Sequence, residues 1–167
     1  MSTFSGSMSA ALAFAISGSP VIGTETKAVP LSSSISMGDG TTAGNAQVGW
    51  ADLTAIPAGQ TYVVDLQAAG ENAFGLAGLV NFNTVRGVYV ENQDTSAANK
   101  VLVGIAGGTD VNGYAVLLEG GGTFLWSAPL GGRPITSANR YLTVTNPGST
   151  SVAIAIGVIG LGAIQDA

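Results

Sequence analysis

Apolar residues recur at every second position in short runs along most of this chain, and this alternation limits the fold more than any other feature. Leu12, Phe14 and Ile16 alternate with alanine, for example. Comparable runs occupy residues 31–37, 47–50, 62–66, 88–91 and 101–105. A period of two is typical of a β-strand with one face on a core. The runs therefore predict a chain built mainly from strands.

Glycine separates these runs and argues against helices. The chain contains 25 glycines, spread as expected for a chain with many turns. The best helical candidate, Leu66–Leu79, contains three glycines, so it predicts at most a short helical turn. Gly38-Asp39-Gly40 is a predicted turn after the run that ends at Met37.

Three later runs are apolar on both faces, namely 114–118, 123–126 and 152–159. Such strands are covered on both sides, here by another sheet or by another subunit. Roughly eight strands without intervening helices predict an all-β fold, an antiparallel β-sandwich that is jelly-roll-like. We assign it to one domain, residues 10–167. The small, polar segment 1–9 is a predicted N-terminal arm, either disordered or docked on a neighbour.

Two segments share a strand, an asparagine-led turn and a second strand. Val90-Glu91-Asn92 precedes the run at 101–105, and Val144-Thr145-Asn146 precedes the run at 152–156. Asparagine can cap its own turn by accepting a backbone hydrogen bond. Two unrelated hairpins or an internal duplication would explain the similarity, and both explanations predict antiparallel pairing.

Composition excludes several classes of function. The chain has no cysteine and no histidine, which removes disulfides, thiolate or imidazole metal sites and a Ser-His-Asp triad. The five Lys and Arg residues are scattered and the net charge is −5, so we expect no nucleic-acid partner. The longest nearly apolar run, Val152–Ile164, is shorter than the ~20 residues of a membrane span, so we expect no membrane partner.

The low charge of the chain predicts a surface that neighbours cover. Charged residues make up 9% of the sequence, against about 25% in ordinary soluble proteins. The mean hydropathy is +0.42, high for a soluble monomer. Obligate interfaces lose charge and gain apolar area, so assembly explains both values.

Three constellations could carry chemistry or ligand binding. Residues 107–113 resemble part of a calcium loop, although an Asn-Gly turn also explains them. Glu91, Asp94 and Glu119 could pair for glycoside hydrolysis, which needs two carboxylates about 5–9.5 Å apart in a cleft. Aromatic residues could line a sugar-binding face or anchor a core, and these are Trp50, Tyr62, Tyr89, Tyr114, Trp126 and Tyr141. We favour the structural explanation for each, and expect no enzyme activity, no metal and no cofactor.

The second half of the chain resembles a family of small glycine-rich virion proteins of tailed phages. The resemblance covers residues 80–162. It is carried by 85–92 (VRGVYVEN), 101–104 (VLVG), 120–125 (GGGTFL), 128–129 (AP), 142–146 (LTVTN) and the apolar run to Gly160. The resemblance implies a β-sandwich or jelly-roll subunit that is built into the particle. It implies no catalytic residues.

The resulting expectation is a phage virion structural protein, a capsid decoration (cement) protein on the capsid surface. It would stabilise the head by bridging major capsid subunits, and it would form a homo-oligomer, with a trimer expected. The alternative is a receptor-binding or fibre-tip module that recognises host surface glycans. Candidate partner-interface residues come from the N-terminal segment and the doubly apolar C-terminal run: Phe4, Met8, Leu12, Val152, Ile154, Ile156 and Val158.

Overall fold

The chain folds into strands joined by turns. The structure is a computed structural model that describes residues 5–18, 25–70, 79–105 and 116–165. No helix occurs among these residues, which form twelve strands: β1 (Gly6–Gly18), β2 (Glu25–Asp39), β3 (Asn45–Ala46), β4 (Val48–Ile56), β5 (Thr61–Asp65), β6 (Leu79–Asn92), β7 (Val101–Ile105), β8 (Val116–Leu118), β9 (Thr123–Ser127), β10 (Arg133–Pro134), β11 (Tyr141–Thr145) and β12 (Val152–Gln165).

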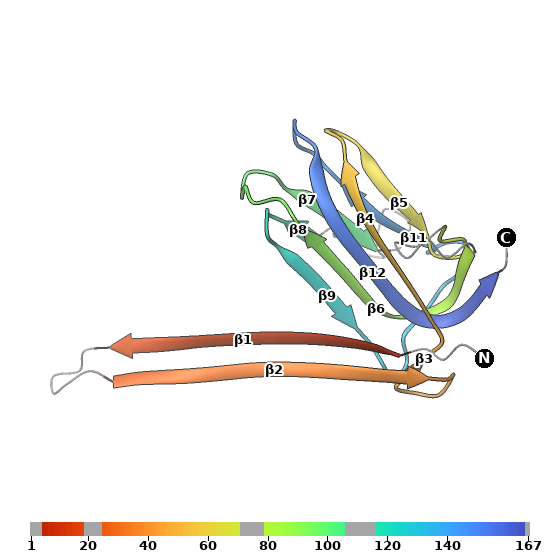
Figure 1. Ribbon diagram of the computed structural model, residues 1–167, viewed down its shortest axis with the longest axis horizontal. Coiled ribbons are helices and arrows are strands. Elements are labelled where there is room, and N and C mark those ends of the chain that lie inside the picture. The colour runs from red at the N-terminus through yellow and green to blue at the C-terminus, as the bar shows by residue number, and fades with distance from the viewer. Residues whose placement is uncertain (1–4, 19–24, 71–78, 106–115, 166–167) are drawn as a thin grey trace.

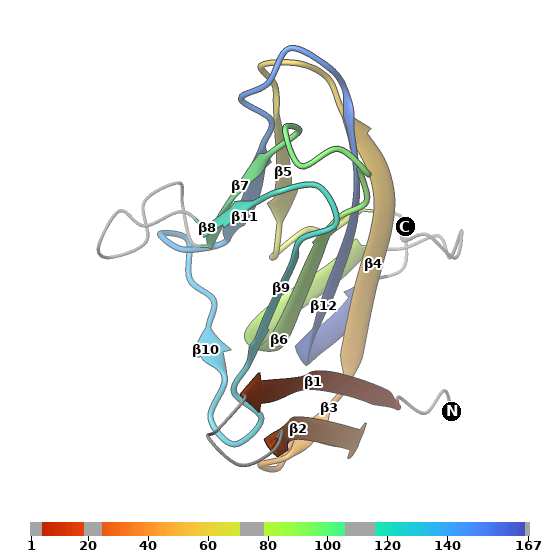
Figure 2. The same ribbon diagram turned by 90° about the vertical axis from the view of Figure 1, so that its left-hand side faces the viewer.

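Two antiparallel sheets face each other and enclose one core (Figure 2). The first, here the β12 sheet, has the order β10-β6-β12-β4, with β9 also paired to β6. The second, the β11 sheet, has the order β5-β11-β7-β8. The predicted all-β, antiparallel class is therefore confirmed, with a sandwich-like arrangement of the sheets. The jelly-roll strand order stays a prediction.

Strand β12 occupies the middle of its sheet, between β6 and β4. Val152, Ile154, Ile156 and Val158 point into the core and are at most 2% exposed. The residues between them, Ala153 to Ile159, lie on the outer face and are half-buried or exposed. Full burial of such an aliphatic side chain contributes about 1.5–3 kcal/mol, so this inner row is a main source of stability.

Two glycines permit the bend of β12 near its end. The register between β12 and β6 shifts after Ile159 and again after Leu161. A Cβ atom at Gly160 would collide with the carbonyl oxygen of Thr84, and one at Gly162 with that of Asn81. The glycine-rich end of the chain is thus required by close backbone approach at two β-bulges.

The asparagine-led connections are not hairpins, contrary to the expectation from the sequence. The first leads from β6 in the β12 sheet to β7 in the β11 sheet, and the second leads from β11 back to β12. Each connection crosses from one sheet to the other. The local pattern identified the strand ends correctly, but a short turn motif does not determine whether the next strand pairs with the previous one.

One edge of the sandwich is closed by a polar contact between the sheets. The hydroxyl of Tyr62 on β5 donates a hydrogen bond to Oδ2 of Asp52 on β4. Burial raises the pKa of Tyr62 well above its usual value, and the hydrogen bond and the charge of Asp52 act in the same direction. The phenol therefore stays protonated and keeps donating to the carboxylate at neutral pH.

For Leu66–Leu79 the sequence predicted at most a short helical turn. The described residues of this segment form a connection without a helix. Residues 66–68 form turns, and Ala69 pairs with Val80 in an isolated bridge. Leu66 and Ala69 are buried in the core. Residues 71–78 of the predicted segment lie outside the described residues.

Candidate interaction surfaces

A long hairpin, β1–β2, projects beyond the sandwich (Figure 1). Its ladder pairs Gly6 with Met37 at the base and Gly18 with Glu25 at the far end, 13 residue pairs in all. β1 begins at Gly6, so the last four residues of the predicted arm at 1–9 form the start of a strand. The alternation at 12–16 and 31–37 predicted both strands but not their pairing.

The base of the hairpin is attached to the sandwich by the buried side chain of Arg86 on β6. Arg86 is 4% exposed. Its Nη1 donates hydrogen bonds to the carbonyl oxygens of Thr42, at 2.6 Å, and Asn45. Its Nη2 donates to the carbonyl oxygen of Thr41 at 3.3 Å. One guanidinium thus holds the loop between β2 and β3. This contact fixes the base of the hairpin and therefore the direction in which the hairpin projects from the sandwich.

The backbone register pairs the large apolar residues of the two hairpin strands with one another. Directly opposite residues share a face of an antiparallel ladder, and here Leu12 opposes Leu31 and Phe14 opposes Val29. The alternate positions carry only small or polar residues and one proline. We call the first set the apolar positions of the hairpin: Met8, Leu12, Phe14, Ile16, Val29, Leu31 and Ile35.

At its base, the hairpin turns the side chains of Ile35 and Met37 toward the sandwich. Met37 is 1% exposed and Ile35 is half-buried, whereas Ser34 and Ser36 are exposed. Farther along, the ladder extends past the last strand of the sandwich (Figure 1). A two-stranded ribbon has no core of its own and is marginal in water, so the projecting part of the hairpin needs a partner layer.

A second apolar surface lies on the sandwich itself, on the outer face of the β12 sheet. It is made mostly of small residues, where antiparallel sheets usually present polar ones. Leu53, on the edge strand β4, is 66% exposed. We call this set the small-residue face: Gly49, Ala51, Leu53, Ala55, Tyr89, Glu91, Leu125, Ala153, Ala155, Gly157 and Ile159.

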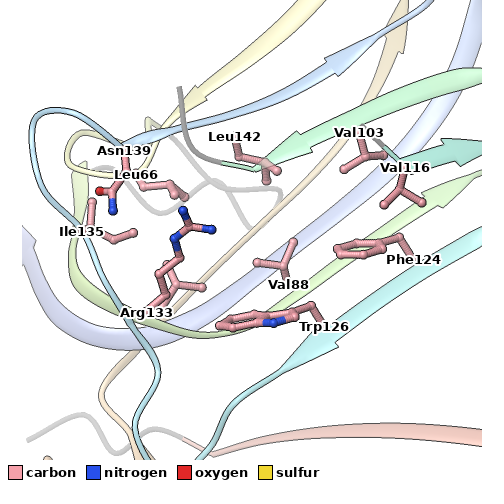
Figure 3. Close-up of a pocket in the computed structure, with 11 residues that line it drawn as sticks. Leu66, Val88, Val103, Val116, Phe124, Trp126, Arg133, Ile135, Asn139 and Leu142 are labelled. Atoms are coloured by element: carbon pink, nitrogen blue, oxygen red, sulfur yellow. The ribbon is translucent and has the colours of Figure 1, made fainter. Parts of the chain in front are cut away.

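A cleft of about 230 Å³ opens between the two sheets. Trp126 and Phe124 of β9 and Val88 of β6 line one side (Figure 3). Val103 and Leu142 lie across from them, and the guanidinium of Arg133 points into the space between (Figure 3). The cleft is mainly apolar with one cationic group, a combination that suits a small ligand. The aromatic residues of the sequence did not predict this cleft, because among the five of them that the structure describes, Trp126 alone lines it.

The three carboxylates considered for glycoside hydrolysis each take part in a separate structural contact. Oε2 of Glu91 accepts a hydrogen bond from the Tyr89 hydroxyl at 3.0 Å, on the small-residue face. Glu119 forms an exposed ion pair with Lys100, with 2.9 Å between Nζ and Oε1. Asp94 accepts hydrogen bonds from the amide of Ser96 and from Asn99. The hydrogen bond from Ser96, followed by that from Asn99, lowers the pKa of Asp94.

Neither a cluster of three acidic side chains nor a membrane-length helix occurs among the described residues. In residues 5–18, 25–70, 79–105 and 116–165, no group of three or more acidic side chains is placed to hold a metal ion. The calcium-like segment 107–113 lies outside the described residues. Within the same ranges, no helix is both long and apolar enough to cross a membrane.

The predicted interface residues separate into two groups. Val152, Ile154, Ile156 and Val158 are core residues of the single chain and are not available to a partner. The interface assigned to them is therefore wrong, because their apolar character is explained by the opposite sheet. Met8 and Leu12 are residues of β1 in the projecting hairpin, and Phe4 lies outside the described residues.

Comparison with known proteins adds no relative. No protein-family model matches the chain, and no curated protein matches it. The interpretation of function therefore rests on the chain's own surfaces.

Proposed function

We propose that this chain is a structural subunit of a phage particle, a decoration protein on the capsid surface that bridges major capsid subunits. One observation carries the proposal, namely the β1–β2 hairpin, which projects as an arm from a sandwich to which it is firmly attached. A strand rises about 3.3 Å per residue. The 13-residue arm therefore spans roughly 43 Å, enough to reach a neighbouring subunit.

The surfaces of the sandwich support the same function. The small-residue face carries a single charged side chain among its described residues, Glu91. Interface cores are depleted in charge, and an uncharged strand edge is prone to pair with another chain. β1 contains no charged residue over its whole length. A bridging subunit needs such surfaces, whereas a monomer in solution gains nothing from them.

A hairpin-shortened variant tests the proposal on particles. Ser9 and Ser34 pair directly across the ladder, so residues 10–33 can be replaced by a two-residue Asn-Gly turn, which suits a hairpin. The full-length chain is expected to bind undecorated capsids of the phage that encodes it and to raise their melting temperature. The shortened variant is expected to lose this effect while its sandwich still folds, as judged by circular dichroism and thermal unfolding. Failure of the full-length chain to bind such capsids would reject the proposal.

The cleft favours a second candidate function, a receptor-binding module for host surface glycans. A sugar ring can stack on Trp126, and Arg133 can donate to its hydroxyl or carboxylate groups. If this function applies, Trp126→Ala is expected to abolish binding on a glycan array, whereas the hairpin-shortened variant should bind as the full-length chain does. An array without any bound glycan would reject this candidate and leave the structural function unaffected.

A further inference from the structure

We infer that the cleft between the two sheets binds a small apolar carboxylate, such as a medium-chain fatty acid. The carboxylate would lie on Arg133, and the hydrocarbon body would lie between the sheets. The inference goes beyond the proposed structural function and does not depend on it. It also differs from the glycan-binding alternative in the chemistry of the ligand. Three properties of the cleft carry it, namely its apolar walls, its one cationic group and its small volume.

The pairing of the strands places Arg133 on the inner side of the β12 sheet. Arg133 on β10 lies directly opposite Val85 on β6, and opposite residues of an antiparallel ladder share a face. Val85 is a core residue that is 3% exposed. The guanidinium therefore points between the sheets, where Figure 3 shows it among apolar side chains.

The same rule places an aromatic wall on this inner side. Phe124 and Trp126 on β9 lie opposite Val90 and Val88 of β6, and both valines are at most 1% exposed. The two aromatic side chains themselves are only half-buried. β8, the edge strand of the other sheet, has three residues, and its Val116 at the cleft is 39% exposed. A bound hydrocarbon would bury this wall further, which the hydrophobic effect favours.

The charge of the cleft favours an anionic group on the ligand. Arg133 is the only charged residue among the described residues that line the cleft, and it is half-buried. Among the described residues, the ion pairs with carboxylates are made by Lys100 and Arg140, not by Arg133. Apolar walls reduce the screening of a charge by water and salt. The planar guanidinium can hold both oxygens of a carboxylate in two parallel hydrogen bonds.

The walls of the cleft fit an apolar body better than a sugar. Apart from Arg133, the one polar residue in the described lining is Asn139. Its side-chain amide is engaged in its own turn, where it donates to the carbonyl of Pro134 and accepts from the amide of Thr136. A sugar in the cleft would leave most of its hydroxyl groups without a hydrogen-bond partner, which costs free energy. A hydrocarbon chain needs no such partners.

The volume of the cleft limits the ligand to a small molecule. The cleft holds about 230 Å³, less than the ~300–1,000 Å³ of typical ligand pockets. At ~30 Å³ for each water-sized group, it accommodates roughly eight such groups. Octanoate, a linear carboxylate of this size, is therefore the probe that fits the cleft.

Calorimetric titration of the full-length chain with four ligands tests the inference. Octanoate is expected to bind at one site per chain. Octanol has a similar body without the charge, octylamine carries the opposite charge, and glucuronate is an acidic sugar without an apolar body. We expect each of these three to bind at least ~10-fold more weakly than octanoate, because a hydrogen bond to a charged group contributes about that factor. Absence of octanoate binding, or binding of any of the three as tightly as octanoate, would overturn the inference.

Replacing Arg133 tests the role of its charge. Arg133→Met keeps an apolar stem but removes the guanidinium, so octanoate should bind about 10–100-fold more weakly while octanol binds as before. Arg140→Met is the matched control, because it removes the same charge from an ion pair with Asp65 outside the cleft. This variant should bind octanoate as the unmodified chain does. Equal octanoate affinities of R133M and R140M would contradict the role of Arg133.

A substitution in β8 tests the position of the ligand without changing Arg133. Val116 pairs with Val103, and Leu117 pairs with Leu102, so these two neighbours in β8 face opposite sides of the sheet. They are 39% and 49% exposed, so each position can accept a larger side chain. Val116→Phe is expected to fill the cleft and abolish octanoate binding, whereas Leu117→Phe should leave it unchanged. Octanoate binding by V116F as tight as that by L117F would place the ligand elsewhere and reject the inference.

Discussion

Replacing Arg86 with methionine is expected to lower the free energy of unfolding by about 3 kcal/mol, because partly buried carbonyl oxygens lose a charged donor. The guanidinium serves the carbonyls of Thr41, Thr42 and Asn45 at once. Methionine fills a similar volume, so the loss reports hydrogen bonding more than a cavity. Lysine cannot replace the planar fork of donors, and Arg86→Lys should recover only part of the loss.

Hydrogen exchange will show whether the loss is local to the hairpin base. In the intact chain, the amide of Gly40 donates to Ala46 and that of Gly44 donates to Pro129. Both amides should exchange much faster in Arg86→Met. Arg140 supplies a control, because its ion pair with Asp65 is at the surface, where such pairs contribute little. Equal stabilities of Arg86→Met and Arg140→Met in urea would contradict the role assigned to Arg86.

Replacing Asn146 with alanine is expected to cost about 3 kcal/mol as well, since several hydrogen bonds of one fully buried amide disappear together. Asn146 is 0% exposed. Its Nδ2 donates to the carbonyls of Ile56 at 2.9 Å and Thr150 at 2.7 Å, and its Oδ1 accepts from the amide of Gly148 at 2.9 Å. These bonds join the crossover after β11 to the end of β4 in the other sheet.

An aspartate substitution tests whether Asn146 stabilises the fold through its donated hydrogen bonds or through its shape alone. Asn146→Asp has nearly the same volume, but a carboxylate cannot donate to the carbonyls and is buried without a cation. We therefore expect it to be at least as destabilising as alanine in urea unfolding at neutral pH. Asn139→Ala is the matched control, because Asn139 also holds a turn but is only half-buried. A loss at Asn146 no larger than that at Asn139 would contradict the account.

The faces of the strands could be predicted from the sequence, because alternation is a local property. The alternate residues of β12 are buried or outward-facing as its pattern indicates. The two asparagines also act as predicted. Oδ1 of Asn92 accepts from the amide of Asp94 at 3.1 Å, as Oδ1 of Asn146 does from Gly148. Each of these features depends on residues only a few positions apart.

The pairing of the strands, and the layer that covers each face of β12, could not be predicted in the same way. β12 pairs with β6 and β4, which lie far from it in the sequence, and alternation does not identify a partner strand. The doubly apolar run at 152–159 indicated cover on both faces, but not which row faces its own core. The interface was therefore assigned to the wrong row. Arg86, beside Val85 and Val88 in an apolar stretch, was the available signal of a buried polar attachment.

The most direct test is the solution mass of the intact chain, measured by size-exclusion chromatography with light scattering over a dilution series. If neighbours cover the hairpin and the small-residue face, the chain should elute as a closed oligomer, such as a trimer, whose mass stays constant on dilution. A single species of 16.5 kDa at every concentration would contradict the account, because both surfaces would then be exposed to water in the free protein.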